Sequence, residues 1–225
     1  DMHILEHGQG QEKTLLFLPC TAEPVWAFEK TVARLAQSWH VFQVVYDGHE
    51  PSYPGDFTSV EQTVDEITDY LRAQGVTCLD AAYGCSLGGS FVGLLAARGN
   101  IRMDYGILGS SDLDQSSKFA AKLQTDLLLP LMFPMLRDGR FKSPLLQKRV
   151  EKQMRQMGDY GAAFLRILGG ARPYLTQQSC KNQFYSDLVT PLPDKIDVPG
   201  TEIHIFYALK MGEKYRARYE QHFAR

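Results

Sequence analysis

A serine set among glycines is the clearest chemical signal in the sequence, in the segment Tyr83-Gly84-Cys85-Ser86-Leu87-Gly88-Gly89. The segment directly follows an apolar run and leads into a helical pattern. A serine on a strained strand-to-helix turn needs very small residues two positions away on either side, and Gly84 and Gly88 occupy those places. Such a turn lifts the hydroxyl clear of the sheet, near the positive end of the helix. The spacing predicts a nucleophile at Ser86, and the alternative is a glycine-rich turn that packs closely or binds phosphate.

The elements that must position this serine are short apolar runs that alternate with helical patterns. The runs that predict buried strands are residues 15–18, 41–46, 79–83, 105–108 and 203–209, and residues 2–6 predict an antiparallel edge strand. Helices are predicted after Pro24, between Ser59 and Gly75, and over residues 89–97. Strands separated by helices imply right-handed crossovers, so the expected fold class is α/β, a mostly parallel sheet covered by helices on both faces.

Residues 111 to 197 break this alternation. They contain helical patterns over 118–129, 145–157 and 162–168, with no convincing strand. A helical insertion over the carboxyl ends of the strands explains this pattern, because such folds bind ligands at that edge. We therefore expect a core built from residues 1–110 and 198–225, and a helical cap from 111–197.

Composition limits the classes of function. The chain has 225 residues and a net charge of −2, which argues against nucleic acid as a partner. Its apolar runs are shorter than the roughly 20 residues of a membrane span, so no integral membrane segment is expected. The four cysteines form no CxxC pair and no zinc-ligand cluster, so no metal site is expected. Four thiols in a chain of this length are too few for a disulfide framework. Without a secretory signal pattern at the start, we expect a cytoplasmic protein with reduced thiols.

With these elements in order, nearly the whole chain resembles the α/β-hydrolase superfamily, specifically its small capped esterases and lipase-like members. The resemblance implies that Ser86 is the nucleophile of a Ser–acid–His triad and that the Leu87 N–H donates to the oxyanion. A second donor follows the first central strand, where many members have His-Gly and this chain has Leu18-Pro19-Cys20-Thr21. Aligning the strand ends places this donor at Thr21, with Cys20 as the adjacent alternative. The motif points Cys85 away from the turn and toward the core.

The acid of the triad is less well defined by the resemblance. Family members often carry it in a G-x-x-D segment after the strand that follows the cap, but counting from Gly212 places Tyr215 in the aspartate position. Glu213 is the nearest carboxylate and is the predicted acid. Because some members place the acid one strand earlier, Asp112 or Asp114 is the alternative.

The histidine of the triad should follow the acid, on a loop after one further strand. After residue 209 the chain offers one helical stretch, 215–223. His204 lies within a predicted strand and His222 near the end of that helix, so neither has the required setting. We therefore expect the 225 residues to lack the final strand and the catalytic histidine.

Together these features predict a serine hydrolase that cleaves carboxylic esters of medium-sized apolar acyl or aryl groups through an acyl-enzyme on Ser86. Its partner would be a small-molecule ester, with no metal or organic cofactor and with an undefined oligomeric state. Two alternatives remain open at this stage. One is a catalytically silent hydrolase-fold protein that binds a small apolar ligand, and the other is a thioester or carbon–carbon hydrolase.

Overall fold

The computed structural model describes residues 3–168, 174–207, 209 and 212–223. A six-stranded sheet in the order β1-β3-β2-β4-β5-β6 forms its centre. The strands are β1 (His3–His7), β2 (Lys13–Leu18), β3 (Trp39–Val45), β4 (Cys78–Cys85), β5 (Arg102–Gly109) and β6 (Glu202–Phe206). Only the β1–β3 pair is antiparallel among these. The predicted mixed, mostly parallel sheet with an antiparallel edge strand is confirmed, although Met2 lies outside the described residues.

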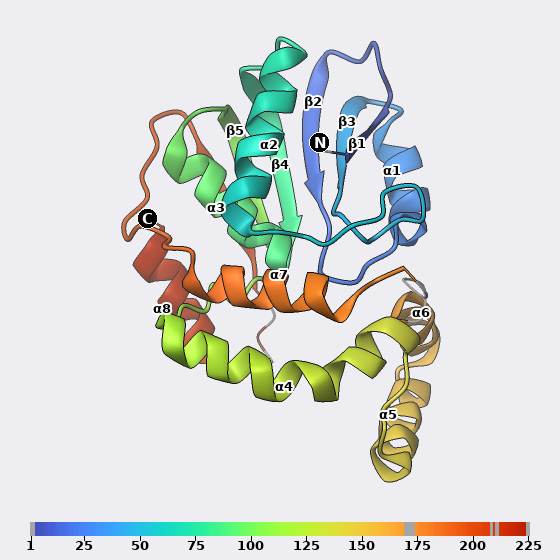
Figure 1. The fold of residues 1–225 in the computed structure, drawn as a ribbon. Helices are drawn as coiled ribbons and strands as arrows, with labels where there is room; N and C mark the ends of the chain where they lie inside the picture. Colours follow the sequence, from blue (N-terminus) through green and yellow to red (C-terminus); the bar gives the residue numbers. More distant parts are fainter. Residues whose placement is uncertain (1–2, 169–173, 208, 210–211, 224–225) are drawn as a thin grey trace.

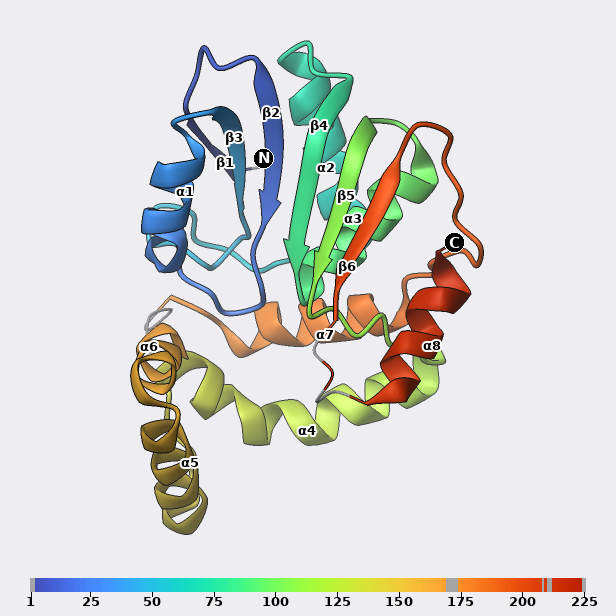
Figure 2. The ribbon, with the colours of Figure 1, turned by 180° about the vertical axis from the view of Figure 1, so that it is seen from behind.

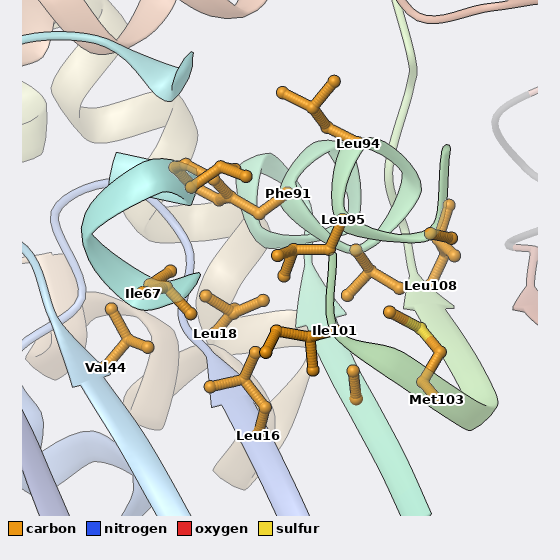
Figure 3. Packing of buried hydrophobic residues seen from close by; sticks show 14 of the residues in the cluster. Leu16, Leu18, Val44, Ile67, Phe91, Leu94, Leu95, Ile101, Met103 and Leu108 are labelled. Atoms are coloured by element: carbon orange, nitrogen blue, oxygen red, sulfur yellow. The ribbon is translucent and has the colours of Figure 1, made fainter. Parts of the chain in front are cut away.

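The central strands are buried on both faces, as their continuous apolar runs predict. In β2, Leu16 and Leu18 pack into one hydrophobic cluster, whereas Leu15 and Phe17 pack into a second one on the opposite face. This alternation follows from the two-residue period of a strand. Figure 3 shows Leu16 and Leu18 in the larger cluster, together with side chains from neighbouring helices.

Helices cover both faces of the sheet (Figure 1). The 3-10 helix η1 (Val25–Phe28) and α1 (Glu29–Leu35) pack on the smaller cluster, and α2 (Val60–Ala73) and α3 (Leu87–Arg98) pack on the larger one. The last described helix, α8 (Glu213–His222), follows β6. The sequence correctly predicts a helix in this last region, and β6 ends at Phe206, three residues before the predicted strand end.

Among the described residues, four helices lie between β5 and β6 in sequence: α4 (Lys118–Asp138), α5 (Pro144–Gln156), α6 (Gly158–Leu168) and α7 (Gln177–Val189). Both views place α7 between the lower end of the sheet and α4, while α5 and α6 extend away from the sheet (Figure 2). The five parallel strands, β2 to β6, run toward α7, so α4 and α7 lie at their carboxyl ends. The division into core and cap at residues 110 and 198 stays a prediction.

Two features of this helical region differ from the sequence-based expectation. Helix α4 was expected to end at Leu129, but it continues through Pro130 and Pro134 to Asp138. Helix α7 was not predicted at all. Its buried side chains are Ser179, Cys180, Gln183 and Ser186, which give no apolar pattern of helical period.

Candidate active site

The strand-to-helix turn at Ser86 has the strained geometry that the glycine spacing predicts. Ser86 directly follows β4 and caps α3 with φ 51° and ψ −112°, a conformation that costs a non-glycine residue about 1–3 kcal/mol. Close backbone approaches explain the flanking glycines. A Cβ on Gly84 would lie 1.9 Å from the Gly88 carbonyl oxygen, and a Cβ on Gly88 would lie 2.4 Å from the Leu18 carbonyl oxygen. Only glycine fits at either position without moving the backbone.

Backbone hydrogen bonds hold this turn in place and leave the hydroxyl exposed. The Ser86 N–H donates to the Gly109 carbonyl oxygen at 2.8 Å, and the Gly89 N–H donates to the Ser86 carbonyl oxygen at 2.9 Å. The Ser86 side chain makes no capping hydrogen bond to α3. The hydroxyl therefore stands at the positive end of a 12-residue helix, where negative charge is stabilised.

A cavity of about 340 Å³ opens beside this serine. Its walls come from the turn, the loops after β2 and β5, α4 and α7. The lining residues are Cys20, Thr21, Ser86, Leu87, Asp112, Asp114, Gln124, Thr125, Leu128, Leu129, Met132, Leu136, Gln183, Phe184, Asp187 and Leu188. The structure thus brings three of the predicted site residues, Ser86, Leu87 and Thr21, to one cavity.

The hydrogen bonds of the loop after β2 distinguish Thr21 from its neighbours. The Cys20 N–H donates to Glu23 Oε2 at 2.8 Å, and the Ala22 N–H donates to His49 Nε2 at 3.0 Å. The described residues offer the Thr21 N–H no protein acceptor. Of the two donors that the sequence left open here, Thr21 is the one whose N–H is free to bind a ligand.

His49 stabilises this loop by accepting a hydrogen bond from the Ala22 N–H. Its Nδ1–H donates to the Asp47 carbonyl oxygen at 3.1 Å, so Nε2 is left as an acceptor for the Ala22 N–H. Burial lowers the pKa of His49 to about 4, which keeps the ring neutral at physiological pH. The bond also holds Ala22 at φ 62°, an unusual conformation for a non-glycine residue. His49 therefore serves the loop structurally and carries no free basic nitrogen.

The structure separates the two sets of candidate acids. Glu213 lies in the first turn of α8, where it is exposed and is not among the cavity-lining residues. Asp112 and Asp114 follow β5 and both line the cavity. Asp114 forms an ion pair with Arg218 of α8. Burial raises the pKa of Asp112, and the positive charge of Arg218 partly offsets this effect. The alternative carboxylates, rather than Glu213, share the cavity with Ser86.

A third cavity carboxylate, Asp187 of α7, could not be identified from sequence. Burial raises its pKa to about 7, a hydrogen bond from Ser90 opposes the shift, and the nearby charge of Asp112 adds to it. Gln183 lies one turn earlier on the same helix, fully buried, and its amide Nε2 approaches His49 Nε2 at 3.5 Å. The one sequence signal for this helix is its N-cap, where Thr176 Oγ1 accepts a hydrogen bond from the Ser179 N–H at 3.0 Å.

None of the six histidines lines the cavity within the described part of the chain. His204 is exposed on β6, as expected for a strand residue, and pairs with Glu202 at 3.3 Å. His222 is buried at the end of α8 and contacts the Pro193 carbonyl oxygen at 3.1 Å. The remaining three, His3, His7 and His40, belong to β1 or β3, where His40 Nε2 lies 2.7 Å from Glu6 Oε2.

Neither a metal-ion cluster nor a membrane-spanning helix is present among the described residues. They contain no group of three or more His, Cys, Asp or Glu side chains placed to hold a metal ion. None of their helices is both long and apolar enough to cross a membrane.

Comparisons with known proteins add a fold assignment. No protein-family model matches the chain, and no curated protein matches it in sequence. Among solved structures, a marine microorganism esterase superposes with a TM-score of 0.67 at 13% identity, covering 99% of this chain and 87% of its own. An enol-lactonase from Burkholderia xenovorans gives 0.59 at 14% identity, with coverages of 97% and 92%. A protein from Desulfitobacterium hafniense that is ascribed to the α/β-hydrolase family gives 0.65 at 16%, with coverages of 91% and 78%. Together with the strand order and the strained serine turn, these similarities show that the chain has the α/β-hydrolase fold.

Proposed function

We propose that the chain is a serine hydrolase that cleaves carboxylic esters of medium-sized apolar acyl or aryl groups. The observation that carries the proposal is the exposed Ser86 hydroxyl, held on a strained turn at a helix N-terminus and facing a cavity. The energetic cost of the turn points to function, because strained backbone of this kind is concentrated at active sites. The similarity to an esterase and an enol-lactonase supports hydrolysis as the reaction class.

In the proposed reaction, Ser86 Oγ attacks the ester carbonyl carbon while its proton passes to a base. The carbonyl oxygen then carries the negative charge of the tetrahedral intermediate, and the N–H groups of Thr21 and Leu87 donate to it. Each such donor is worth about 10²–10³ in rate. Collapse of the intermediate releases the alcohol and leaves an acyl-enzyme, which water hydrolyses to restore Ser86.

We assign the carboxylate of the site to Asp112 instead of Glu213. Asp112 lines the same cavity as Ser86, whereas Glu213 is exposed on α8 outside that lining. Asp112 also follows β5, the strand next to the one that carries the serine. Asp112→Asn should therefore lower kcat much more than Glu213→Gln, which serves as the matched control.

The walls of the cavity favour an apolar group on the substrate. Helix α4 contributes Leu128, Leu129, Met132 and Leu136, while α7 contributes Phe184 and Leu188. Apolar lining with a few polar groups is typical of small-molecule sites. At about 340 Å³ the cavity is at the small end of the range for ligand pockets, which favours a medium-sized acyl or aryl group.

A panel of p-nitrophenyl esters of graded chain length, together with acyl-CoA thioesters, tests the proposed function. We expect hydrolysis of the esters, highest for medium chains, and its loss in Ser86→Ala. Preferential cleavage of the thioesters would reassign the substrate class. Ester turnover that survives in the Ser86→Ala variant would contradict the proposal.

A second candidate function is a catalytically silent protein that binds a small apolar ligand in the same cavity. The observation that favours it is that none of the described histidines lines the cavity, so the usual base for the Ser86 proton is not among them. Calorimetric binding of an ester analogue, without turnover of any member of the panel, would select this candidate.

A further inference from the structure

Two cysteine thiols lie in contact with each other next to the proposed active site. Cys85 is the last residue of β4, next to Ser86, and Cys20 follows β2, next to Thr21. Their sulfur atoms are 3.0 Å apart. The family motif predicts that Cys85 points toward the core, but the structure leaves it half-buried and in contact with a second thiol.

The sheet brings these two cysteines together. Strands β2 and β4 are parallel neighbours, and Leu18 is paired with Gly84 at their carboxyl ends. Paired strands lie about 4.8 Å apart, and a disulfide needs Cα atoms within roughly 4.4–6.8 Å. Cys85 is one residue beyond that pair and Cys20 two residues beyond it. The fold therefore holds the two sulfur atoms 3.0 Å apart, so a small movement of the loop and the turn brings them within bonding distance.

The contact also makes the two sulfurs chemically unequal. The Cys20 thiol donates its hydrogen to Cys85, and this bond lowers the pKa of Cys85 against the opposing effect of burial. A hydrogen bond from Tyr83 lowers it further. The same contact raises the pKa of Cys20, together with burial. Since the thiolate is the reactive form, Cys85 is the one that attacks.

Small reagents can reach the pair, because Cys20 lines the cavity together with Ser86 and Thr21 and because Cys85 is partly exposed. The other two cysteines lack this arrangement. Cys78 is exposed at the opposite end of β4, and Cys180 is buried in α7 with its pKa raised to about 12 by burial.

We propose that Cys20 and Cys85 form an oxidisable site at which a hydroperoxide makes a disulfide between the loop after β2 and the serine turn. With hydrogen peroxide, the Cys85 thiolate attacks one oxygen in the first step, the O–O bond breaks, and hydroxide departs, so that Cys85 becomes a sulfenic acid. The hydroxide takes up the proton that the Cys85 thiol has lost and becomes the first water molecule. In the second step the Cys20 sulfur attacks the Cys85 sulfur, the S–O bond breaks, and water leaves. The two thiols lose two electrons, and hydrogen peroxide is reduced to two molecules of water.

The cross-link would change the proposed catalytic geometry, and this consequence alone rests on the proposed function. A disulfide requires the sulfur atoms to close from 3.0 Å to about 2.05 Å. Thr21 and Ser86 each follow a cross-linked residue directly, so the oxyanion donor and the nucleophile both move. A displacement near 1 Å costs about 10²-fold in rate, and we expect a loss of ester hydrolysis of that size.

Mass spectrometry of the full chain after mild hydrogen peroxide treatment tests the proposal without any measurement of activity. We expect a loss of about 2 Da, a linked peptide pair containing Cys20 and Cys85, and full reversal by dithiothreitol. Cys20→Ser and Cys85→Ser should each abolish the linked pair. Cys78→Ser, the matched control, should leave it unchanged.

Independent alkylation of Cys20 and Cys85 after oxidation would overturn the proposal, and so would a linked pair that includes Cys78 or Cys180. A cross-link that leaves ester hydrolysis unchanged would overturn its regulatory consequence. Because the linked pair is detected by mass, absence of ester hydrolysis in the untreated protein would count against the proposed function and not against the disulfide.

Discussion

Substitution of Gly88 by alanine tests the close packing that sets up the serine turn. The new methyl group would lie 2.4 Å from the Leu18 carbonyl oxygen and 3.1 Å from the Leu18 Cβ. An ordinary contact is about 3.5 Å, so β2 and α3 must separate by about 1 Å. The clash is with the backbone of a fully buried strand residue, so a rotamer change cannot relieve it. We expect a loss of about 3 kcal/mol, at the upper end of overpacking effects, and a Tm lower by about 6–12 °C.

Gly93→Ala in the same helix is the matched control. Its Cβ would meet only side-chain ends, Leu192 Cδ1 at 3.3 Å and Phe223 Cζ at 3.4 Å, and these can shift slightly. Alanine also favours the helix over glycine by about 1 kcal/mol, so this variant should be as stable as the parent or slightly more stable. Differential scanning fluorimetry together with ester hydrolysis measures both effects. A Gly88→Ala variant with the parent's Tm and activity would refute the packing argument.

Three further substitutions test the surroundings of the site. His49→Leu removes the acceptor of the Ala22 N–H, so denaturant titration should show a free energy of unfolding lower by about 1–3 kcal/mol, and kcat should fall. Parent-like values of both quantities would contradict the role of His49. Tyr46→Phe removes the hydroxyl that donates to the Pro19 carbonyl oxygen at 2.8 Å. The same titration should show a free energy of unfolding lower by about 1–2 kcal/mol. The pKa of Asp187 is about 7 in the native state and 3.8 for a free side chain, so between these pH values the native protein keeps a proton that the unfolded chain has lost. The parent's free energy of unfolding therefore falls as pH rises through this range. Asp187→Asn should abolish this fall, worth up to about 4 kcal/mol by pH 8, and parallel pH profiles for the two proteins would contradict the assignment.

The sheet and the serine turn could be predicted because their determinants are local. A strand buried on both faces needs a continuous apolar run, and the run Leu15–Leu18 has no other simple explanation. The turn likewise needs glycine at Gly84 and Gly88, since any Cβ there would meet backbone. Such constraints act over a few residues and are therefore visible in the sequence.

Helix α7 is not visible in the sequence because hydrogen bonds hold much of its buried face, where Cys180 is the one apolar side chain among the four buried residues. Ser179 Oγ accepts from the Phe57 N–H at 3.0 Å, and Ser186 Oγ accepts from the Val60 N–H at 3.2 Å. These bonds join segments more than 100 residues apart in the chain. Hydrophobic periodicity cannot detect a helix of this kind, so the sequence alone does not place Gln183 and Asp187 at the cavity.

The proposed acid of the site could not be selected from the sequence for a related reason. The choice between Glu213 and Asp112 depends on which loop reaches the cavity, and that depends on how α8 and the loop after β5 pack. Counting residues from Gly212 contains no information about this packing. The family pattern offers Asp112 or Asp114 as an alternative only because some members place the acid after the strand that corresponds to β5.

The most direct test of the central claim is the reaction of the chain with a fluorophosphonate probe, followed by peptide mapping. An activated serine attacks the phosphorus and keeps the label. We expect the label on Ser86, and we expect none in Ser86→Ala. A protein with a cooperative thermal transition that carries no label on Ser86, or carries it on another residue, would contradict the assignment of Ser86 as the nucleophile.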